Sequence, residues 1–245
     1  MNNYKLTIQY DGGRYKGWQR LGAGENTIQG KLEKVITEMI GEQTEIIGCS
    51  RTDTGVHALS QIASFKCRRH FSVEEIKTYL NHYLPNDICV TEVKEVDELF
   101  HARFHAKSKT YLYKIWNHEE GNPFMRKYSM HIKEKLDLEA IKEAAPVFLG
   151  EHDFTSFSNA RSKKKSFIRE IYEVDIKEEH GCIVIRIRGN GFLYNMVRKM
   201  VGALIEVGLS KTEQTSIQKI LASKERNMVG VIADANGLYL EKVEY

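Results

Sequence analysis

Apolar and polar residues alternate along residues 4–10, which predicts a strand with one buried face. Residues 28–39 then carry apolar side chains at helical spacing. Asn26 and Gln29 fit a capping box that would begin this helix, and Gly41 is expected to end it. The pattern therefore changes from a period of two to a period near 3.6 within the first 41 residues.

A second capping box, Ser72 with Glu75, predicts another helix that ends before Pro85. Short apolar runs typical of strands lie at 45–48, 61–65 and 88–96. The first hundred residues therefore predict the order β-α-β-β-α-β.

A similar order returns in the rest of the chain. Asp137 is placed to cap a helix that Pro146 should shorten or kink. Strands are predicted at 110–117, 168–178, 182–188 and 237–245, and further helices at 194–207 and 212–222.

The two orders resemble each other, which predicts an α+β fold made of two related halves, 1–105 and 106–245. The first would carry Asp53, and the second would carry Tyr111 and Arg198. Antiparallel sheets in each half, set side by side, would create a cleft between the halves.

The composition is that of an ordinary globular protein, with 245 residues and a net charge of +3. No apolar run approaches the roughly 20 residues that a membrane helix needs, and the N-terminus does not have a signal-peptide pattern. We therefore expect a cytoplasmic protein without a membrane segment. The four cysteines are too widely spaced for a zinc knuckle, and no metal site is expected.

The segment CSRTDTGVHALSQ, residues 49–61, places Arg51 two positions before Asp53 among small turn-forming residues. An ionised aspartate in a dry cleft can act as a nucleophile or as a base. An aspartate in a turn can equally serve only to cap that turn. The pattern of residues leaves both roles open.

Arg198 lies in an apolar helical segment, where a buried guanidinium needs an anion. It could pair with a distant carboxylate, for which Asp53 is the candidate, or extend from an exposed face towards water. Tyr111 lies in a strand-like run with alternating tyrosines, which could equally be core packing.

Basic residues cluster at 68–70, 101–109 and 161–165, and residues 100–107 interleave cations with aromatic rings. Stacking rings and cations suit RNA, although each cluster could also be a solvated face. His101 and His105 are four apart but are not accompanied by a third metal ligand at a known spacing. The candidate RNA-binding residues are Arg68, Arg69, Phe100, His101, Ala102, Arg103, Phe104, Lys163, Lys164 and Lys165.

Six segments in register resemble the tRNA pseudouridine synthase A family over essentially the whole chain. They read SRTDTGVHALSQIASF, LPNDICV, FHARFHAKSKTYLYKI, GEHDFTSF, FLYNMVRKMVGALIEVG and ADANGLYLEKVEY. The resemblance implies the pseudouridine synthase fold, with two α+β halves around a central basic cleft, in a homodimer. It implies isomerisation of uridine to pseudouridine in the anticodon stem-loop of tRNA, at the family's positions 38, 39 and 40, without a cofactor or metal.

The resemblance also implies roles for individual residues. Asp53 matches the family's nucleophile, and Arg51 matches the arginine implicated in base flipping. Tyr111 matches the tyrosine that packs on the target base, Arg198 the arginine that pairs with the nucleophile, and Leu238 a leucine that lines the base pocket. The adjacency of Arg51 and Asp53 would couple flipping of the base to attack on it.

The chain departs from the family pattern at Ser50, Ser60, Ser64 and Tyr15, none of which is a matched core position. Two other functions fit part of the sequence. Asp53-Thr54-Gly55 spells the motif of an aspartic protease, but that chemistry needs two aspartates that share one proton. An RNA-binding protein without catalysis would not need the combination of Asp53, Arg51, Tyr111 and Arg198.

Overall fold

The structure is a computed structural model that describes residues 1–22, 25–159 and 166–245, and the chain divides into two compact units. Unit 1 comprises Met1–Lys107 and Tyr239–Tyr245, and unit 2 comprises Ser108–Leu238. The sequence-based division placed all of 106–245 in one half. In the structure Tyr239–Tyr245 belong to unit 1, where Tyr239 pairs with His57 and their rings stack with centroids 4.8 Å apart.

Unit 1 contains the predicted β-α-β-β-α-β order. Its elements are β1 (Asn2–Tyr10), α1 (Ile28–Ile40), β2 (Ile46–Gly48), β3 (His57–Cys67), α2 (Val73–Tyr83), β4 (Ile88–Val96) and the C-terminal strand β10 (Leu238–Glu244). The strand order is β4-β1-β3-β10, and β2 also pairs with β3. All these pairs are antiparallel except the short parallel pair of β3 and β10.

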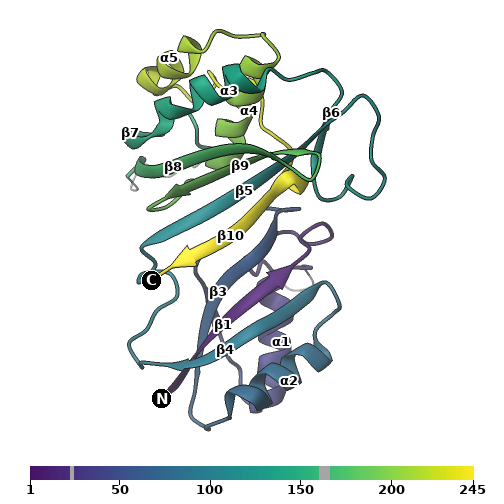
Figure 1. Cartoon of the computed structure of the whole chain (residues 1–245). Helices are drawn as coiled ribbons and strands as arrows, with labels where there is room; N and C mark the ends of the chain where they lie inside the picture. Colours follow the sequence, from purple (N-terminus) through teal and green to yellow (C-terminus); the bar gives the residue numbers. More distant parts are fainter. Residues whose placement is uncertain (23–24, 160–165) are drawn as a thin grey trace. The chain divides into compact units, whose positions relative to one another are not determined.

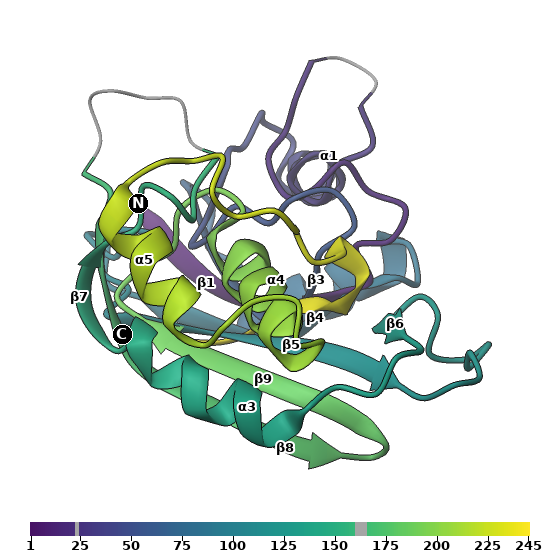
Figure 2. The same cartoon turned by 90° about the horizontal axis from the view of Figure 1, so that it is seen from above.

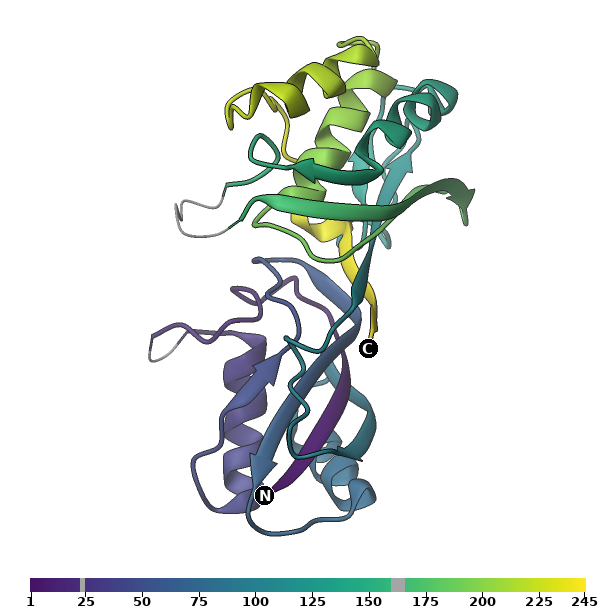
Figure 3. The same cartoon turned by 90° about the vertical axis from the view of Figure 1, so that its left-hand side faces the viewer.

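The alternating pattern of β1 builds the core of unit 1. Tyr4, Leu6 and Ile8 are fully buried, and the Tyr4 ring stacks on Phe65 of the neighbouring strand with centroids 5.4 Å apart. Helix α1 adds the buried side chains of its apolar face; it lies beside α2 in Figure 1 and along the strands of unit 1 in Figure 3. The alternation of apolar and polar residues in the sequence therefore determines which face of β1 is buried in the core.

The predicted ends of the helices have different outcomes. The Ser72–Glu75 capping box is confirmed, and Gly41 ends α1 with a φ of 82°. The predicted box of Asn26 and Gln29 is wrong, because Thr27 caps α1 by accepting a bond from the Gly30 amide. The Gln29 side chain instead donates to Glu33 and to the Ile46 carbonyl.

Unit 2 also contains both strands and helices. Its strands are β5 (Ser108–Asn117), β6 (Met130–Ile132), β7 (Gly150–Asp153), β8 (Ile168–Glu179) and β9 (Cys182–Gly189). They pair in the antiparallel order β5-β9-β8-β7, and β6 runs parallel to β5. Helices α3 (Leu138–Ala144), α4 (Met196–Gly208) and α5 (Thr215–Ser223) cover one face of these strands in Figures 1 and 2.

The predicted effect of Pro146 on α3 is confirmed, since the helix gives way to a 3₁₀ turn, η1 (Ala145–Phe148). A second 3₁₀ turn, η2 (Ala235–Gly237), precedes β10. Two α+β units whose strands pair in a largely antiparallel way agree with the predicted fold class. Within the described parts of both units, no helix has the length and apolar character needed to cross a membrane.

Candidate active site

The Asp53 loop, residues 49–56, connects β2 to β3 in unit 1. The Val56 amide donates to the Asp53 carbonyl at 3.1 Å, and Gly55 has a φ of 80°, so a tight turn follows the aspartate directly. Asp53 is half-buried, Arg51 is exposed, and Thr52 between them is buried. The two charged residues that the sequence singled out thus flank a residue that anchors the loop.

Thr52 is the inward anchor of the loop. Its hydroxyl lies 2.8 Å from the hydroxyl of Tyr10, and burial raises the pKa of that tyrosine, so Tyr10 is a neutral phenol. Gln61 of β3 donates to the Ser50 carbonyl at 2.7 Å and accepts from the Ser50 amide at 3.3 Å. The backbone before Asp53 is therefore tied to both β1 and β3.

A second loop, residues 11–19, is hydrogen-bonded to the Asp53 loop. The Trp18 amide donates to the Thr52 carbonyl at 3.0 Å, and the Gly55 amide donates to the Tyr15 carbonyl at 3.4 Å. Gly17 has a φ of 88°, and a Cβ atom there would lie 2.5 Å from the Thr52 carbonyl oxygen. Only glycine lets the two backbones approach this closely.

Asp87, just before β4, holds the 11–19 loop in place. Its carboxylate accepts from the Tyr15 hydroxyl at 2.6 Å and forms an ion pair with Arg14. Burial and the bond to Asp87 raise the pKa of Tyr15 to about 12, so the hydroxyl keeps its proton and remains the donor. Tyr15, a departure from the family pattern, thus adds a polar tie that a phenylalanine could not make.

In unit 2, Arg198 lies in the first turn of α4. Its Nε donates to the Ala233 carbonyl at 2.6 Å and its Nη1 to Asn195 Oδ1 at 3.3 Å. The Ala233 amide donates back to the Arg198 carbonyl at 3.1 Å. The guanidinium is therefore oriented by the segment before η2, and the side chain is half-buried rather than fully buried.

Tyr111 of β5 is buried, and its ring meets Phe192 edge-on with centroids 5.0 Å apart. Leu238 is also buried, at the start of β10. Tyr113, two residues after Tyr111 on β5, donates to the Asp234 carbonyl at 2.8 Å. Burial and Asp234 raise the pKa of Tyr113, whereas Arg198 acts in the opposite direction. Tyr113 thus ties β5 to the segment that orients Arg198.

The segment 100–104 in unit 1 divides into buried and exposed residues. Ala102 is fully buried against Cys49 and Ile62, so its side chain offers no surface to RNA, contrary to its place among the RNA-binding residues. Phe104 is 73% exposed and stacks on His101 with centroids 4.2 Å apart. Burial lowers the pKa of His101. The segment therefore presents stacked rings beside the exposed Arg103, while Phe100 packs on Tyr245.

Arg68 and Arg69 are exposed and follow the last residue of β3, whereas the Asp53 loop precedes its first residue. The strand has 11 residues, which at about 3.3 Å each separates the two ends by roughly 36 Å. Arg69 lies over the Phe71 ring at 4.8 Å. This basic pair is therefore remote from Asp53 within unit 1.

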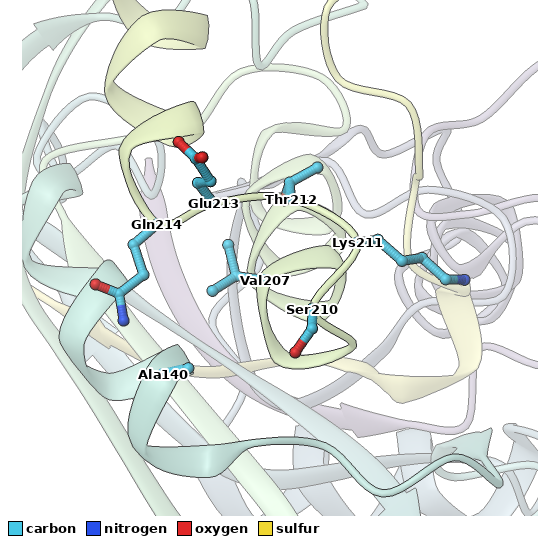
Figure 4. A pocket seen from close by; sticks show the side chains of 7 residues that line it. All are labelled: Ala140, Val207, Ser210, Lys211, Thr212, Glu213 and Gln214. Carbon is cyan, nitrogen blue, oxygen red and sulfur yellow. The ribbon is translucent and has the colours of Figure 1, made fainter.

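Lys163, Lys164 and Lys165 lie outside the described residues. In the remainder of the chain, no group of three or more histidine, cysteine, aspartate or glutamate side chains is arranged to hold a metal ion. Figure 4 shows a pocket in unit 2, between the first turns of α3, the end of α4 and the turn before α5. It contains none of the predicted site residues, and its lining is Ala140, Val207, Ser210, Lys211, Thr212, Glu213 and Gln214.

Sequence reasoning missed the residues that support the Asp53 loop. They are Tyr10, Gly12, Gly17, Trp18, His57 and Gln61. Glycines are clustered at positions 12, 13 and 17 of the segment 11–17. These glycines, close to Tyr15 and Trp18, were the feature of the sequence that could have indicated close backbone packing here.

Comparison with known proteins defines the class of protein first. A family model described as tRNA pseudouridine synthase matches residues 6–105 and 144–245. A protein named tRNA pseudouridine synthase A 2 from Bacillus anthracis is 62% identical over 245 residues, all of both chains. A tRNA pseudouridine synthase A from Thermoanaerobacter sp. (strain X514) is 44% identical, again over all of both chains. The chain therefore belongs to the tRNA pseudouridine synthase A family.

The solved structures include a more distant likeness. A chain from the crystal structure of a Cbf5-Nop10-Gar1 complex superposes with a TM-score of 0.36 and 11% identity. The superposition covers 82% of this chain and 45% of that chain. The family assignment rests on the sequence matches.

Proposed function

We propose that this protein is an isomerase that converts uridine to pseudouridine in the anticodon stem-loop of tRNA, with Asp53 as the nucleophile. Membership of the tRNA pseudouridine synthase A family supports the reaction and the substrate. The observation that carries the role of Asp53 is its loop. The carboxylate is half-buried at a turn whose backbone is held by β1, by β3 and by the 11–19 loop.

In the proposed reaction, the Asp53 carboxylate attacks either C1′ of the ribose or C6 of the uracil. The glycosidic C1′–N1 bond breaks, the uracil turns, C5 bonds to C1′, and the bond between Asp53 and the carbon that it attacked breaks to release the carboxylate. The proton on C5 leaves and N1 takes up a proton, so the product is an isomer of the substrate. A pre-positioned carboxylate favours this step, because a well-oriented reacting group avoids much of the entropic cost of a bimolecular encounter.

The remaining roles follow the family resemblance. Arg51, exposed two residues before Asp53, would occupy the space that the flipped uridine leaves, because a base stacked in a helix must be extruded to react. Arg198 would supply a positive charge that keeps Asp53 ionised. Tyr111 and Leu238 would contact the uracil. The hydrogen bonds from Arg198 to Ala233 and Asn195 support the proposed role of Arg198, since they fix the direction of its guanidinium.

For tRNA binding, we propose that the exposed residues Arg103 and Phe104, with His101, meet the nucleic acid by stacking and phosphate contacts. Arg68 and Arg69, at the other end of β3, would meet a different part of the tRNA. Lys163, Lys164 and Lys165 are proposed to contact phosphates. We propose action as a homodimer in the cytoplasm, without a cofactor or metal. Sedimentation of the purified protein tests the dimer.

Substitution of Asp53 by asparagine tests the proposed function. The amide is a poor nucleophile, so release of tritium from tRNA labelled at C5 of uridine should stop while tRNA affinity stays near that of the wild type. The wild-type protein serves as the control for turnover and binding. Turnover of the Asp53→Asn protein within about tenfold of the wild type would remove Asp53 from the role of nucleophile. A wild-type protein that binds tRNA but releases no tritium would favour the RNA-binding function without catalysis.

A further inference from the structure

His57 is the first residue of β3 and lies four residues after Asp53. Its side chain is only 2% exposed, so it is not placed to touch a substrate. Its ring stacks on Tyr239, with centroids 4.8 Å apart and planes inclined by 26°, and the two residues are paired in the β3–β10 register. One side of the imidazole is thus fixed by the C-terminal strand.

Further contacts of the ring involve the turn of residues 11–13. The Gly12 amide donates to His57 Nδ1 at 3.1 Å. Asp11 Oδ1 lies 3.1 Å from the same nitrogen, and this oxygen also accepts from the Gly13 amide at 2.8 Å. The Gly12 amide can only donate, so its contact requires Nδ1 to accept, as it does in a neutral imidazole with the proton on Nε2, whereas a protonated Nδ1 would instead donate to Asp11 Oδ1.

The 11–13 turn lies directly against the backbone of the Asp53 loop. A Cβ atom on Gly12 would stand 1.9 Å from the Val56 carbonyl oxygen, so no other residue leaves room for this approach. Val56 in turn donates its amide to the Asp53 carbonyl. A shift of the Gly12 amide would therefore reach the turn that carries Asp53 through two successive backbone contacts.

We propose that His57 is a positioning residue for Asp53, and that its Nδ1 atom fixes the 11–13 turn against the Asp53 loop by accepting the Gly12 amide proton. This inference rests on the proposed function only for its readout, since the contacts themselves do not depend on the reaction. A residue with a merely packing role at this position would need an aromatic ring but no acceptor. The distinction between ring and acceptor makes the proposal testable.

Two variants separate these roles. His57→Phe keeps a ring that can stack on Tyr239 but removes the acceptor and leaves the buried Gly12 amide without a partner. His57→Asn loses the ring but can place its amide oxygen near the position of Nδ1. In single-turnover tritium release, the phenylalanine variant should be about 10–100-fold slower, because a misplacement near 1 Å has effects of this size. Its tRNA Kd should change less than about threefold. The asparagine variant should keep its rate within about fivefold of the wild type.

Wild-type rate in the phenylalanine variant, or an asparagine variant as slow as the phenylalanine variant, would overturn the proposal. A second measurement depends neither on the variants nor on turnover. It is the ¹⁵N chemical shifts of the His57 ring in the wild-type protein near neutral pH. They should report a neutral ring protonated at Nε2, and a ring protonated at Nδ1 would refute the acceptor role. Because this tautomer can be read from a protein that makes no pseudouridine, failure of the proposed function and failure of this inference remain distinguishable.

Discussion

Replacing Gly17 by alanine should disturb the position of Asp53 without touching any group that takes part in the reaction. The added Cβ would lie 2.5 Å from the Thr52 carbonyl oxygen and 3.1 Å from the Asp53 carbonyl carbon. Both neighbours are backbone atoms of the Asp53 loop, so they cannot rotate away as a flexible side chain would. Either the 11–19 loop or the Asp53 loop must move.

The size of the movement follows from the distances. Ordinary van der Waals contact begins at 3.4 Å, so the Cβ and the oxygen must separate by about 3.4 − 2.5 = 0.9 Å. Misplacement of a reacting group by about 1 Å can cost roughly 10²-fold in rate. Gly17 also has a φ of 88°, where an L-residue costs about 1–2 kcal/mol in stability. We therefore expect a single-turnover rate about 30–100-fold lower and a free energy of unfolding about 2 kcal/mol lower.

Gly41 provides a matched control, because its φ of 82° is nearly the same but no atom lies within 4 Å of a Cβ built there. Gly41→Ala should lower the free energy of unfolding by about 1–2 kcal/mol from backbone strain alone and leave the rate unchanged. The assay is tritium release under single-turnover conditions, with urea unfolding of each variant. If Gly17→Ala reacts at the wild-type rate, or if both variants lose rate equally, then the contact with Thr52 does not position Asp53.

Three further changes test separate parts of the site. Arg198→Met should move the acid side of the pH–rate profile to higher pH, because loss of the cation raises the pKa of Asp53; an unchanged profile would mean that the two are not paired. Tyr111→Phe should keep near-wild-type activity while Tyr111→Ala loses roughly 1–3 kcal/mol of base stacking, measured as kcat/KM, and full activity in both would leave only core packing. Burial and then Arg226 lower the pKa of Lys199, so the unfolded chain binds more protons between that lowered pKa and the ordinary value. The free energy of unfolding of the wild type should therefore rise with pH across that window, whereas that of Lys199→Met should not. Urea unfolding of both proteins from neutral pH to about pH 10.5 measures this. A difference in unfolding free energy between the two proteins that does not change with pH would contradict it.

The sequence predicted best those features that depend on neighbouring residues. The Ser72–Glu75 capping box needs only one turn of chain, and Pro146 shortens α3 by its own geometry. The Asn26–Gln29 box had the same local pattern but is wrong, because Glu33 and the Ile46 carbonyl take the Gln29 side chain. Strands β6 and β7, with three and four residues, are too short to show a period.

Features that depend on distant parts of the chain could not be read from a pattern. The membership of Tyr239–Tyr245 in unit 1 follows from pairing with a strand about 180 residues earlier. Asp53 was singled out by residue type and by resemblance, but its supports come from β1, β3 and the 11–19 loop. A glycine shows its function only when the backbone that approaches it is known, and for Gly17 that backbone lies 35 residues further along the chain.

Two adjacent cations on α4 illustrate how the packing of a helix separates similar residues. The sequence drew attention to Arg198 as a charge in an apolar helix, but the fully buried charge is its neighbour Lys199, which is 2% exposed. Successive residues of a helix point about 100° apart, so one can face the core while the other faces the edge of the unit. Lys199 donates to the carbonyls of Ser156 and Arg226, at 3.1 and 3.0 Å, and so joins α4 to the segments after β7 and after α5. Lys199 is thus buried against neutral carbonyls, whereas the guanidinium of Arg198 is half-buried and is directed by Ala233 and Asn195.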